Sequence, residues 1–343
     1  MLSRVADSVY WMTRYIERAE NVARFVDVNL HLMLDLPRDT EQQWEPLVRT
    51  TGDRELFEAT YESYTASNVI RFLTFDSTYV NSIYGCAASA RDNARSVREV
   101  ISSEMWTQLN RFYLMVRTAA FGNQDFDYAP HEVFSQVKVA GHLFEGVMDA
   151  TMSHGEAWHF GRMGRLLERA DKTTRILDMK YFILLPDVSY VGTPYDNIQW
   201  AALLQSASAL EMYRKKYGRI SPRSVVEFLL LDMEFPRAVR HCLKVAEDSL
   251  RAITGTPSGS YANRAEQRLG RSCANLDFTS TEEILAIGVH EFLDRLQSEI
   301  NEVGDAIFEA FFATEPTPTE APRKPTEEDE DEDTGMQIQT QGA

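Results

Sequence analysis

Residues 12–27 read MTRYIERAENVARFVD, and this stretch decides the fold. Its apolar residues recur every three or four positions, which is the spacing of a helix with one buried face. This stripe consists of Met12, Tyr15, Ala19, Val22, Ala23 and Val26, extended by Leu30 and Met33. The charged residues Glu17, Glu20, Arg24 and Asp27 gather on the opposite side, with Arg18 on the flank. We therefore predict a long first helix with one apolar and one charged face.

The same periodicity runs through most of the chain. Alternating β-branched runs are almost absent, and the 17 glycines and 12 prolines fall mostly at junctions. These features predict an all-α fold, with caps at Ser221-Pro222 and at Ser280 to Glu283. Further helices are expected at about 55–65, 66–82, 85–118, 131–150, 156–184, 197–217, 222–231, 236–254, 262–271 and 280–312.

The opening stretch recurs 151 residues later as MGRLLERADKTTRILD, residues 163–178, with seven of sixteen positions identical. A second match follows at an offset of 156 residues. It includes Trp44/Trp200, Tyr61/Tyr217, Phe72/Phe228, Asp76/Asp232, Cys86/Cys242 and Arg95/Arg251. Two long collinear matches predict a tandem duplication. We expect a helical bundle of two repeats, 1–150 and 151–313, related by a pseudo-twofold axis.

The charge is uneven along the 343 residues. The formal net charge is −17, and residues 314–343 hold nine acids and two bases, so that this segment carries −7 and residues 1–313 carry −10. Prolines and the acidic run Glu327 to Asp333 predict a disordered acidic tail. The acidic body argues against a nucleic-acid or membrane partner, because both require a basic surface.

The chain has no apolar run of the roughly 20 residues that a membrane span requires. Its first residues, Met1 to Asp7, carry charge where a secretory signal would be apolar. Three cysteines without a CxxC pairing are too few for a disulfide framework. We therefore expect a cytoplasmic protein, with Cys86 and Cys242 packed in the core.

Several charged residues recur as the same type in both repeats, although a solvated helix face should diverge. The repeated positions that we propose as a candidate functional cleft are Arg14, Glu17, Arg18 and Arg24, with Arg165, Glu168, Arg169 and Arg175. Two interpretations stay open. The charged face is buried against other helices as an ion-pair ladder, or it lines a cleft shared between the halves. Arginine suits both, because its guanidinium pairs two oxygens of a carboxylate or phosphate.

A second basic cluster is a candidate anion-binding site. It comprises Arg91, Asn93, Arg95 and Arg98. In the second repeat only Arg251 survives of these arginines, which suggests that the first repeat carries any anion recognition. The alternative is that the arginines pair with acids of the body.

Metal and nucleophile signals are weak. Glu156 and His159 form one Glu-x-x-His element, but di-iron bundles need two copies and two further glutamates. His142 and Glu145 also lie one turn apart, a spacing that is common in acidic helical proteins. No phosphate-loop, dinucleotide or serine-nucleophile motif is present in the sequence. We predict no metal and no cofactor on this chain.

The repeated Glu17-Arg18 and Glu168-Arg169 lie within Arg-x-x-Glu-Arg-Ala and resemble the bacterial alpha-E domain family. The segments LSRVADSVYW (2–11), SARDNARSVR (89–98), GRMGRLLERA (161–170) and FPRAVR (235–240) also fit its pattern. The likeness covers about residues 1–312. It implies an all-helical protein encoded beside, or fused to, a circularly permuted ATP-grasp protein.

By that association, the resemblance implies a role in ATP-dependent peptide or amide-bond formation. This chain would be the partner subunit that holds a peptide or amino-acid substrate or docks the ligase, with ATP and Mg²⁺ on the partner. No catalytic residue follows from the resemblance. Two alternatives stay open: an enzyme acting on peptide or amide bonds with Glu17 or Glu168 as general base, and a purely structural scaffold.

Overall fold

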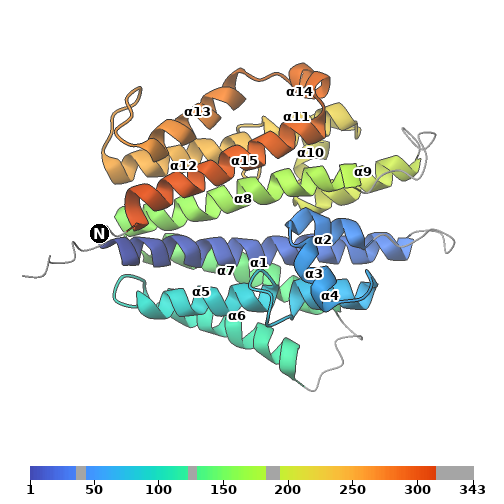
Figure 1. The fold of residues 1–343 in the computed structure, drawn as a ribbon, viewed down its shortest axis with the longest axis horizontal. Coiled ribbons are helices and arrows are strands. Elements are labelled where there is room, and N and C mark those ends of the chain that lie inside the picture. Colours follow the sequence, from blue (N-terminus) through green and yellow to red (C-terminus); the bar gives the residue numbers. More distant parts are fainter. Residues whose placement is uncertain (36–43, 123–129, 183–193, 314–343) are drawn as a thin grey trace, which may run out of the picture. The chain divides into compact units, whose positions relative to one another are not determined.

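The computed structural model describes residues 1–35, 44–122, 130–182 and 194–313, and within them the chain is helical without a strand, as predicted (Figure 1). The first eight helices are α1 (Ser3–Asp35), α2 (Glu45–Thr51), α3 (Arg54–Thr60), α4 (Ala66–Thr74), α5 (Ile83–Ser96), α6 (Ser103–Phe121), α7 (Pro130–Thr151) and α8 (Glu156–Phe182). The others are α9 (Pro194–Ser206), α10 (Leu210–Tyr217), α11 (Pro222–Leu230), α12 (Val239–Thr254), α13 (Arg264–Phe278), α14 (Thr281–Ile287), α15 (Val289–Ile307) and the π-helical turn η3 (Phe308–Phe312). The predicted tail, 314–343, lies outside the described residues.

Some predicted helix limits are wrong. Three predicted helices are each broken into two: 85–118, 197–217 and 280–312. The range 85–118 is interrupted where the Ser102 hydroxyl caps a new helix. The range 197–217 is interrupted at Ser208, whose φ is 52°, and the range 280–312 at Gly288, whose φ is 106°. Predicted helix 66–82 ends at Thr74, and α2 forms where the sequence predicts no helix. Apolar periodicity continues through these breaks and conceals them.

The predicted caps are confirmed. The Ser221 hydroxyl accepts the backbone N–H of Ser224, and Pro222 occupies the first turn of α11. The Ser280 hydroxyl accepts the N–H of Glu283, whose carboxylate accepts the Ser280 N–H in return.

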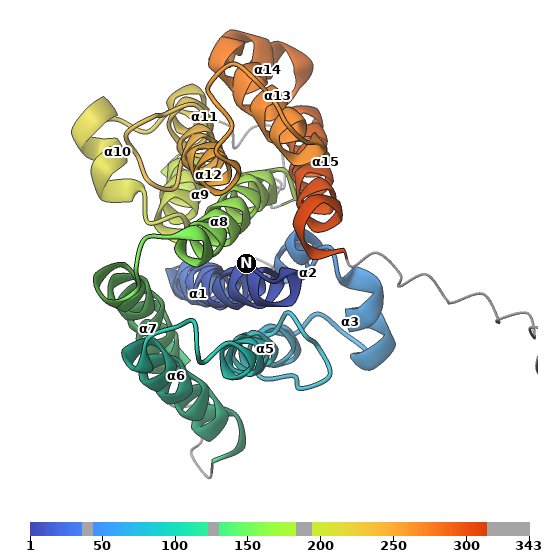
Figure 2. The same cartoon turned by 90° about the vertical axis from the view of Figure 1, so that its left-hand side faces the viewer.

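Helices α1 and α8 lie side by side at the centre of residues 1–312 and run in the same direction (Figures 1 and 2). The Thr13 hydroxyl donates to the carbonyl oxygen of Gly161 at 2.8 Å. A Cβ atom on Gly164 would lie 2.6 Å from the carbonyl oxygen of Tyr10. The backbones of α1 and α8 therefore approach closely, because Gly161 and Gly164 of α8 have no side chain.

The remaining helices cover the central pair from both sides. Helices α5 and α7 pack on α1 with α6 against them, and α12 and α15 pack on α8 with α13 outside (Figure 2). The apolar stripe of α1 is buried as predicted at Met12, Ala19, Val22, Ala23 and Val26. Each side of the central pair thus has its own apolar core.

Aromatic contacts recur at the offset of 156 residues. Phe57 stacks on Tyr61 with ring centroids 5.1 Å apart, and Tyr213 stacks on Tyr217 at the same distance. Three further pairs recur: Phe57–Phe72 as Tyr213–Phe228, Tyr61–Phe72 as Tyr217–Phe228, and Phe72–Tyr79 as Phe228–Phe235. These matched contacts support the duplication, which stays a prediction. Residues 1–312 together form one compact unit.

The cysteines also match. Cys86 and Cys242 are fully buried free thiols, which confirms the prediction of core packing, and burial raises the pKa of each to about 12. Their Sγ atoms donate to the carbonyl oxygens of Val80 and Pro236, six residues earlier in both cases.

The close approach of α1 and α8 makes a testable prediction at Gly164. Gly164→Ala places a methyl group against the Tyr10 carbonyl, so we expect a loss of about 1–3 kcal/mol in the free energy of unfolding. Gly146→Ala is the matched control, because a Cβ on that glycine of α7 meets nothing within 4 Å. Urea unfolding followed by circular dichroism measures both. Equal stability of the two variants would contradict the close contact.

Candidate functional site

The repeated Glu-Arg dipeptides pair with each other across α1 and α8. The Glu17 carboxylate accepts from Nε and a terminal nitrogen of Arg169 at 2.9 and 2.8 Å. In the reciprocal pair, the Glu168 carboxylate accepts from Nε and a terminal nitrogen of Arg18 at 2.6 and 2.9 Å. Glu17 is 2% exposed and Glu168 is fully buried. Both pairs use the two-nitrogen fork of arginine, which matches the two oxygens of a carboxylate.

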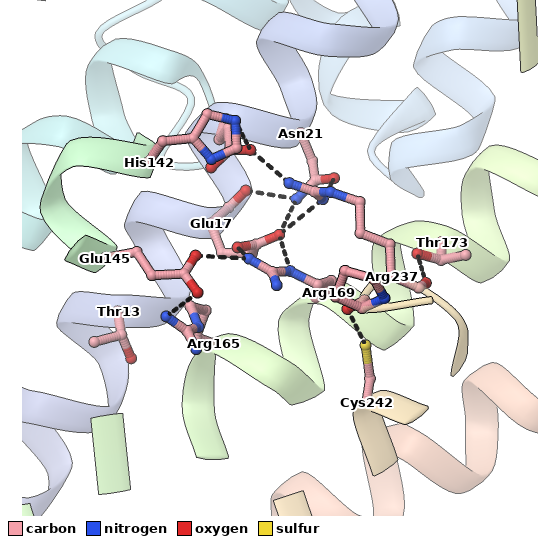
Figure 3. A network of polar contacts seen from close by, with 12 residues as sticks. Thr13, Glu17, Asn21, His142, Glu145, Arg165, Arg169, Thr173, Arg237 and Cys242 are labelled. Atoms are coloured by element: carbon pink, nitrogen blue, oxygen red, sulfur yellow. Dashed lines mark hydrogen bonds and ion pairs between the residues drawn. The ribbon is translucent and has the colours of Figure 1, made fainter. Parts of the chain in front are cut away.

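Further donors surround the Glu17 carboxylate. Arg237, in the segment before α12, lies 3.1 Å away, and the Asn21 amide donates at 2.8 Å (Figure 3). Burial opposes ionisation of Glu17, but the charges of Arg169 and Arg237 more than offset it and hold the pKa of that carboxyl far below its usual range. Glu17 is therefore a permanent anion at neutral pH.

The Glu168 carboxylate has an equivalent set of cations. Arg14 Nε lies 2.9 Å and Lys172 Nζ 3.5 Å from its oxygens. Burial again opposes ionisation, and the charges of Arg18, Lys172 and Arg14 lower the pKa of Glu168 well below the ordinary value.

The ladder extends one turn further on each helix. Glu20 and Arg24 pair at 2.6 Å on α1, and Asp171 and Arg175 pair at 2.9 Å on α8. Burial works against the Asp171 charge, but Lys172 and Arg175 lower the pKa of Asp171 to about 2. The carboxylates of the repeated face thus form a buried ion-pair ladder, in which Glu17 and Glu168 pair across the two helices and Glu20 and Asp171 pair along their own helix.

An open cleft adjoins one end of this ladder and is lined by arginines. Its volume is about 690 Å³. The lining residues are His142, Glu145, Gly146, Met148 and Asp149 of α7, Trp158, Arg162, Arg165 and Arg169 of α8, and Ser208, Phe235, Pro236 and Arg237. Figure 3 shows Glu145, Arg165, Arg169 and Arg237 converging beside Glu17. We call this space the arginine cleft.

The positive charge of the arginine cleft is only partly neutralised. Arg169 and Arg237 pair with Glu17, whereas Glu145, 2.7 Å from Arg165 and 3.1 Å from Arg169, is the acid that pairs with Arg165. Arg165 Nε is buried and has no hydrogen-bond partner among the described residues. Arg162 stacks over the Trp158 ring at 5.1 Å and has no ion pair in the described part of the chain.

The pKa of Arg165 is lowered from its ordinary value. Burial lowers it, the Glu145 carboxylate opposes that effect, and the neighbouring Arg169 lowers it further. The pKa of Arg24 is also lowered, by burial and then by Arg237.

The remaining repeated arginines lie elsewhere. Arg18 and Arg175 line a second cavity of only about 40 Å³. Arg14 lies over the Trp11 ring at 4.8 Å and donates to the Tyr10 hydroxyl at 3.1 Å. The two Glu-Arg motifs therefore do not face one cavity: Arg169 reaches the arginine cleft and Arg18 reaches the small one.

The candidate anion cluster of the first repeat binds aromatic rings. Arg91 lies 4.8 Å from the Tyr113 ring centroid, and Arg98 lies 4.9 Å from that of Trp106. Arg91 donates to the Asn110 side chain at 2.8 Å, Asn93 donates to the Ser89 carbonyl at 3.0 Å, and Arg95 is exposed. Within the described ranges, Arg91, Arg95 and Arg98 form no ion pair with body acids, and none of them lines the arginine cleft.

Of the residues that line the arginine cleft, the sequence analysis proposed only Arg165 and Arg169 as part of a cleft, and it missed the other cleft arginines, Arg162 and Arg237. Arg237 does have a sequence signal, because it lies in the FPRAVR segment (235–240) that fits the family pattern. The residue 156 positions earlier is Asn81, which accepts a hydrogen bond from Arg18. The Glu-x-x-His pair brings no metal cluster together, since Glu156 instead binds the amino terminus of Met1. One His/Asp cluster, Asp27, His31 and His131, was also missed.

These features define an all-helical protein organised around reciprocal Glu–Arg pairs. The chain belongs to the Alpha-E family, described as a predicted alpha-helical domain with a conserved ER motif, which matches residues 1–312.

Its relatives include uncharacterized proteins of Mycobacterium bovis and Mycobacterium tuberculosis, each 24% identical over 329 residues. The match covers 89% of this chain and 36% of each relative, so this chain spans about a third of their length. No solved structure matches the chain. None of the helices in the described ranges combines the length and apolar character needed to cross a membrane.

The buried carboxylates predict a specific acid sensitivity. Glu17, Glu168 and Asp171 have lowered pKa values in the folded state, so the stability they confer is complete above their unfolded values of 4.5 and 3.8. It is lost as the pH falls through the folded values. We expect the free energy of unfolding to fall steeply from about pH 5 to pH 2.

Two variants test the origin of that slope. Glu168→Gln should cost about 3–5 kcal/mol at pH 7, because it leaves buried cations unpaired, and it should make the decline shallower. Glu58→Gln removes an exposed partner of Arg54 and should change neither quantity appreciably. Urea titrations at stepped pH measure both, and an unchanged acid slope in Glu168→Gln would contradict the assignment.

Proposed function

We propose that the arginine cleft binds the carboxylate of a peptide or amino-acid substrate and presents it to a circularly permuted ATP-grasp ligase that forms an amide bond. The observation that carries this proposal is that Arg162 and Arg165 face an open space of about 690 Å³ without a full set of acid partners among the described residues. Arg162 and Arg165 retain donors that no acid of the described residues satisfies. A carboxylate is the complementary ligand, since its two oxygens match the guanidinium fork.

The division of roles within the site follows from burial. Glu17 and Glu168 are at most 2% exposed, so they hold the arginines in place and do not contact a ligase or substrate directly. Arg162 and Arg165 are half-buried and reach the cleft. The Asp149 side chain is 68% exposed, and its carboxylate lies 3.6 Å from His154 Nε2. Asp149 therefore pairs with His154 and not with the cleft arginines.

The alternative of Glu17 or Glu168 as general base is disfavoured. A general base works best when its pKa lies near the operating pH, whereas burial among cations lowers the pKa of both carboxyls. The proposed role is therefore substrate holding, with ATP and Mg²⁺ on the ligase and no cofactor on this chain.

A partner ligase is supported by the family resemblance and by chain length. The matched region makes up 36% of the mycobacterial relatives, so the same domain occurs within much longer chains. A substrate-holding domain that works with a separate catalytic domain would account for its occurrence within longer chains.

The cleft is tested by binding of a carboxylate probe. We expect Arg162→Gln and Arg165→Gln each to weaken binding of the dipeptide alanyl-glutamate about tenfold, because each removes a charge-assisted hydrogen bond. The diamide of the same dipeptide should bind weakly to every form. Arg214→Gln, an exposed arginine of α10 outside the cleft, is the matched control. Calorimetric titration measures the affinities, and equal binding of the acid and the diamide would overturn the proposed specificity.

The partner is tested separately. We expect the full chain, at near-endogenous level in its native host, to co-purify with an ATP-grasp protein. Arg162→Gln should retain that partner while amide formation slows. Failure to recover any ATP-grasp protein would contradict the partnership, and it would leave the anion cleft to be judged by the binding experiment.

A further inference from the structure

The geometry points to a divalent transition-metal site, distinct from the arginine cleft, formed by Asp27, His31 and His131. Each of these residues offers one ligand atom, and the three atoms lie within 4.8 Å of one another. Two imidazoles and one carboxylate form a nitrogen-rich set that suits zinc and its first-row neighbours and leaves positions for water or another ligand. The inference does not depend on the proposed function.

The three ligands come together from two helices. Asp27 and His31 lie one turn apart on α1, and His131 lies in the first turn of α7. His131 Nδ1 is 2.7 Å from Asp27 Oδ1, and His31 Nδ1 is 3.7 Å from the same oxygen. The imidazoles of His31 and His131 have centroids 4.8 Å apart at an interplanar angle of 82°. Small side-chain rotations therefore suffice to place three donors around one ion.

Neighbouring groups orient the ligands. Lys138 Nζ binds Asp27 Oδ2 at 2.7 Å and leaves Oδ1 directed at the histidines. His31 Nδ1 lies 2.8 Å from the Asp27 carbonyl oxygen, a contact that holds the imidazole beside Asp27. The Lys138 charge opposes a cation, so we expect micromolar rather than nanomolar affinity.

The site is accessible from solvent. The side chains of His31 and His131 are 54% and 61% exposed, whereas that of Asp27 is 5% exposed. An ion can therefore enter without unfolding, and the buried carboxylate anchors it. None of Asp27, His31 and His131 lines the arginine cleft, so the two sites are distinct.

The second repeat supplies an internal comparison. Asp178 and His290 form the same contact, with Nδ1 2.7 Å from Oδ1. At the position corresponding to His31, 151 residues later, the sequence has Phe182, which offers no ligand atom. The Asp–His pair alone therefore serves to join helices in both repeats. The third donor, His31, is the addition that turns the pair of the first repeat into a chelate.

The experiment is calorimetric titration of the full chain, free of any purification tag, with zinc chloride at pH 7.5. We expect one equivalent of Zn²⁺ to bind. His31→Ala and His131→Ala should each weaken binding at least tenfold, since each removes one of three ligands. His290→Ala is the matched control, because it breaks the equivalent Asp–His contact and should leave zinc affinity unchanged. Substitution at exposed His31 leaves the fold intact, which far-ultraviolet circular dichroism verifies.

The acidic run Glu327 to Asp333 is present in every variant and provides a competing source of cation binding. Zinc binding that is equally tight in His31→Ala and the native chain would overturn the proposal, as would no detectable binding by the native chain. A second readout uses Co²⁺: the visible ligand-field bands expected for nitrogen coordination should appear with the native chain and with His290→Ala, and should be lost with His131→Ala. Their persistence in His131→Ala would contradict the assignment.

Discussion

The structure depends on burying the Glu17 and Glu168 carboxylates between α1 and α8, and each of the two is paired with an arginine of the opposite helix. An isolated buried carboxylate carries a large desolvation penalty, which Arg169 offsets for Glu17 and Arg18 offsets for Glu168. These pairs also fix the register of the helices. A slip of one turn, about 5.4 Å, would separate Glu17 from Arg169 and Glu168 from Arg18.

The two ends of the ladder differ because residues around the shared pairs have diverged. Where the first repeat has Asn81, the second has Arg237, which adds a guanidinium beside Glu17. At the other end, Phe312 of η3 packs on Tyr10 with centroids 5.3 Å apart, next to Arg14. One end is closed by aromatic side chains, while the other remains open and rich in arginine. The same scaffold thus supports a structural role and a binding role at different places.

Much of the fold was predictable because helical periodicity is a local property. The apolar stripe of α1 follows from the spacing of its apolar residues. The recurrence of Glu17-Arg18 as Glu168-Arg169 follows from comparing the sequence with itself. The partners of these residues were not predictable in the same way, since a helical wheel gives the side on which Glu17 lies but not the helix that faces it. The contact between Asp27 and His131 joins residues 104 positions apart and arises from the packing of α7 on α1.

The positions at which helices begin and end were also only partly predictable from local sequence. The apolar pattern continues past Ser102, so periodicity predicts one helix where a capping hydroxyl begins another. The open question about the repeated charges, ladder or cleft, also required tertiary contacts. The carboxylates belong to the ladder, whereas Arg165 and Arg169 belong to the ladder's edge and to the cleft at once.

The reciprocal pairing has a consequence for the origin of the chain. Glu17 with Arg169 and Glu168 with Arg18 form a self-complementary arrangement, in which each helix offers the same acid and the same base to the other. That is the property of an isologous interface, where one surface patch binds a second copy of itself. A single repeat would carry a complete half of this interface on one helix. Fusion of two copies of such a self-complementary helical unit is an origin that would unite the predicted duplication with the crossed ion pairs.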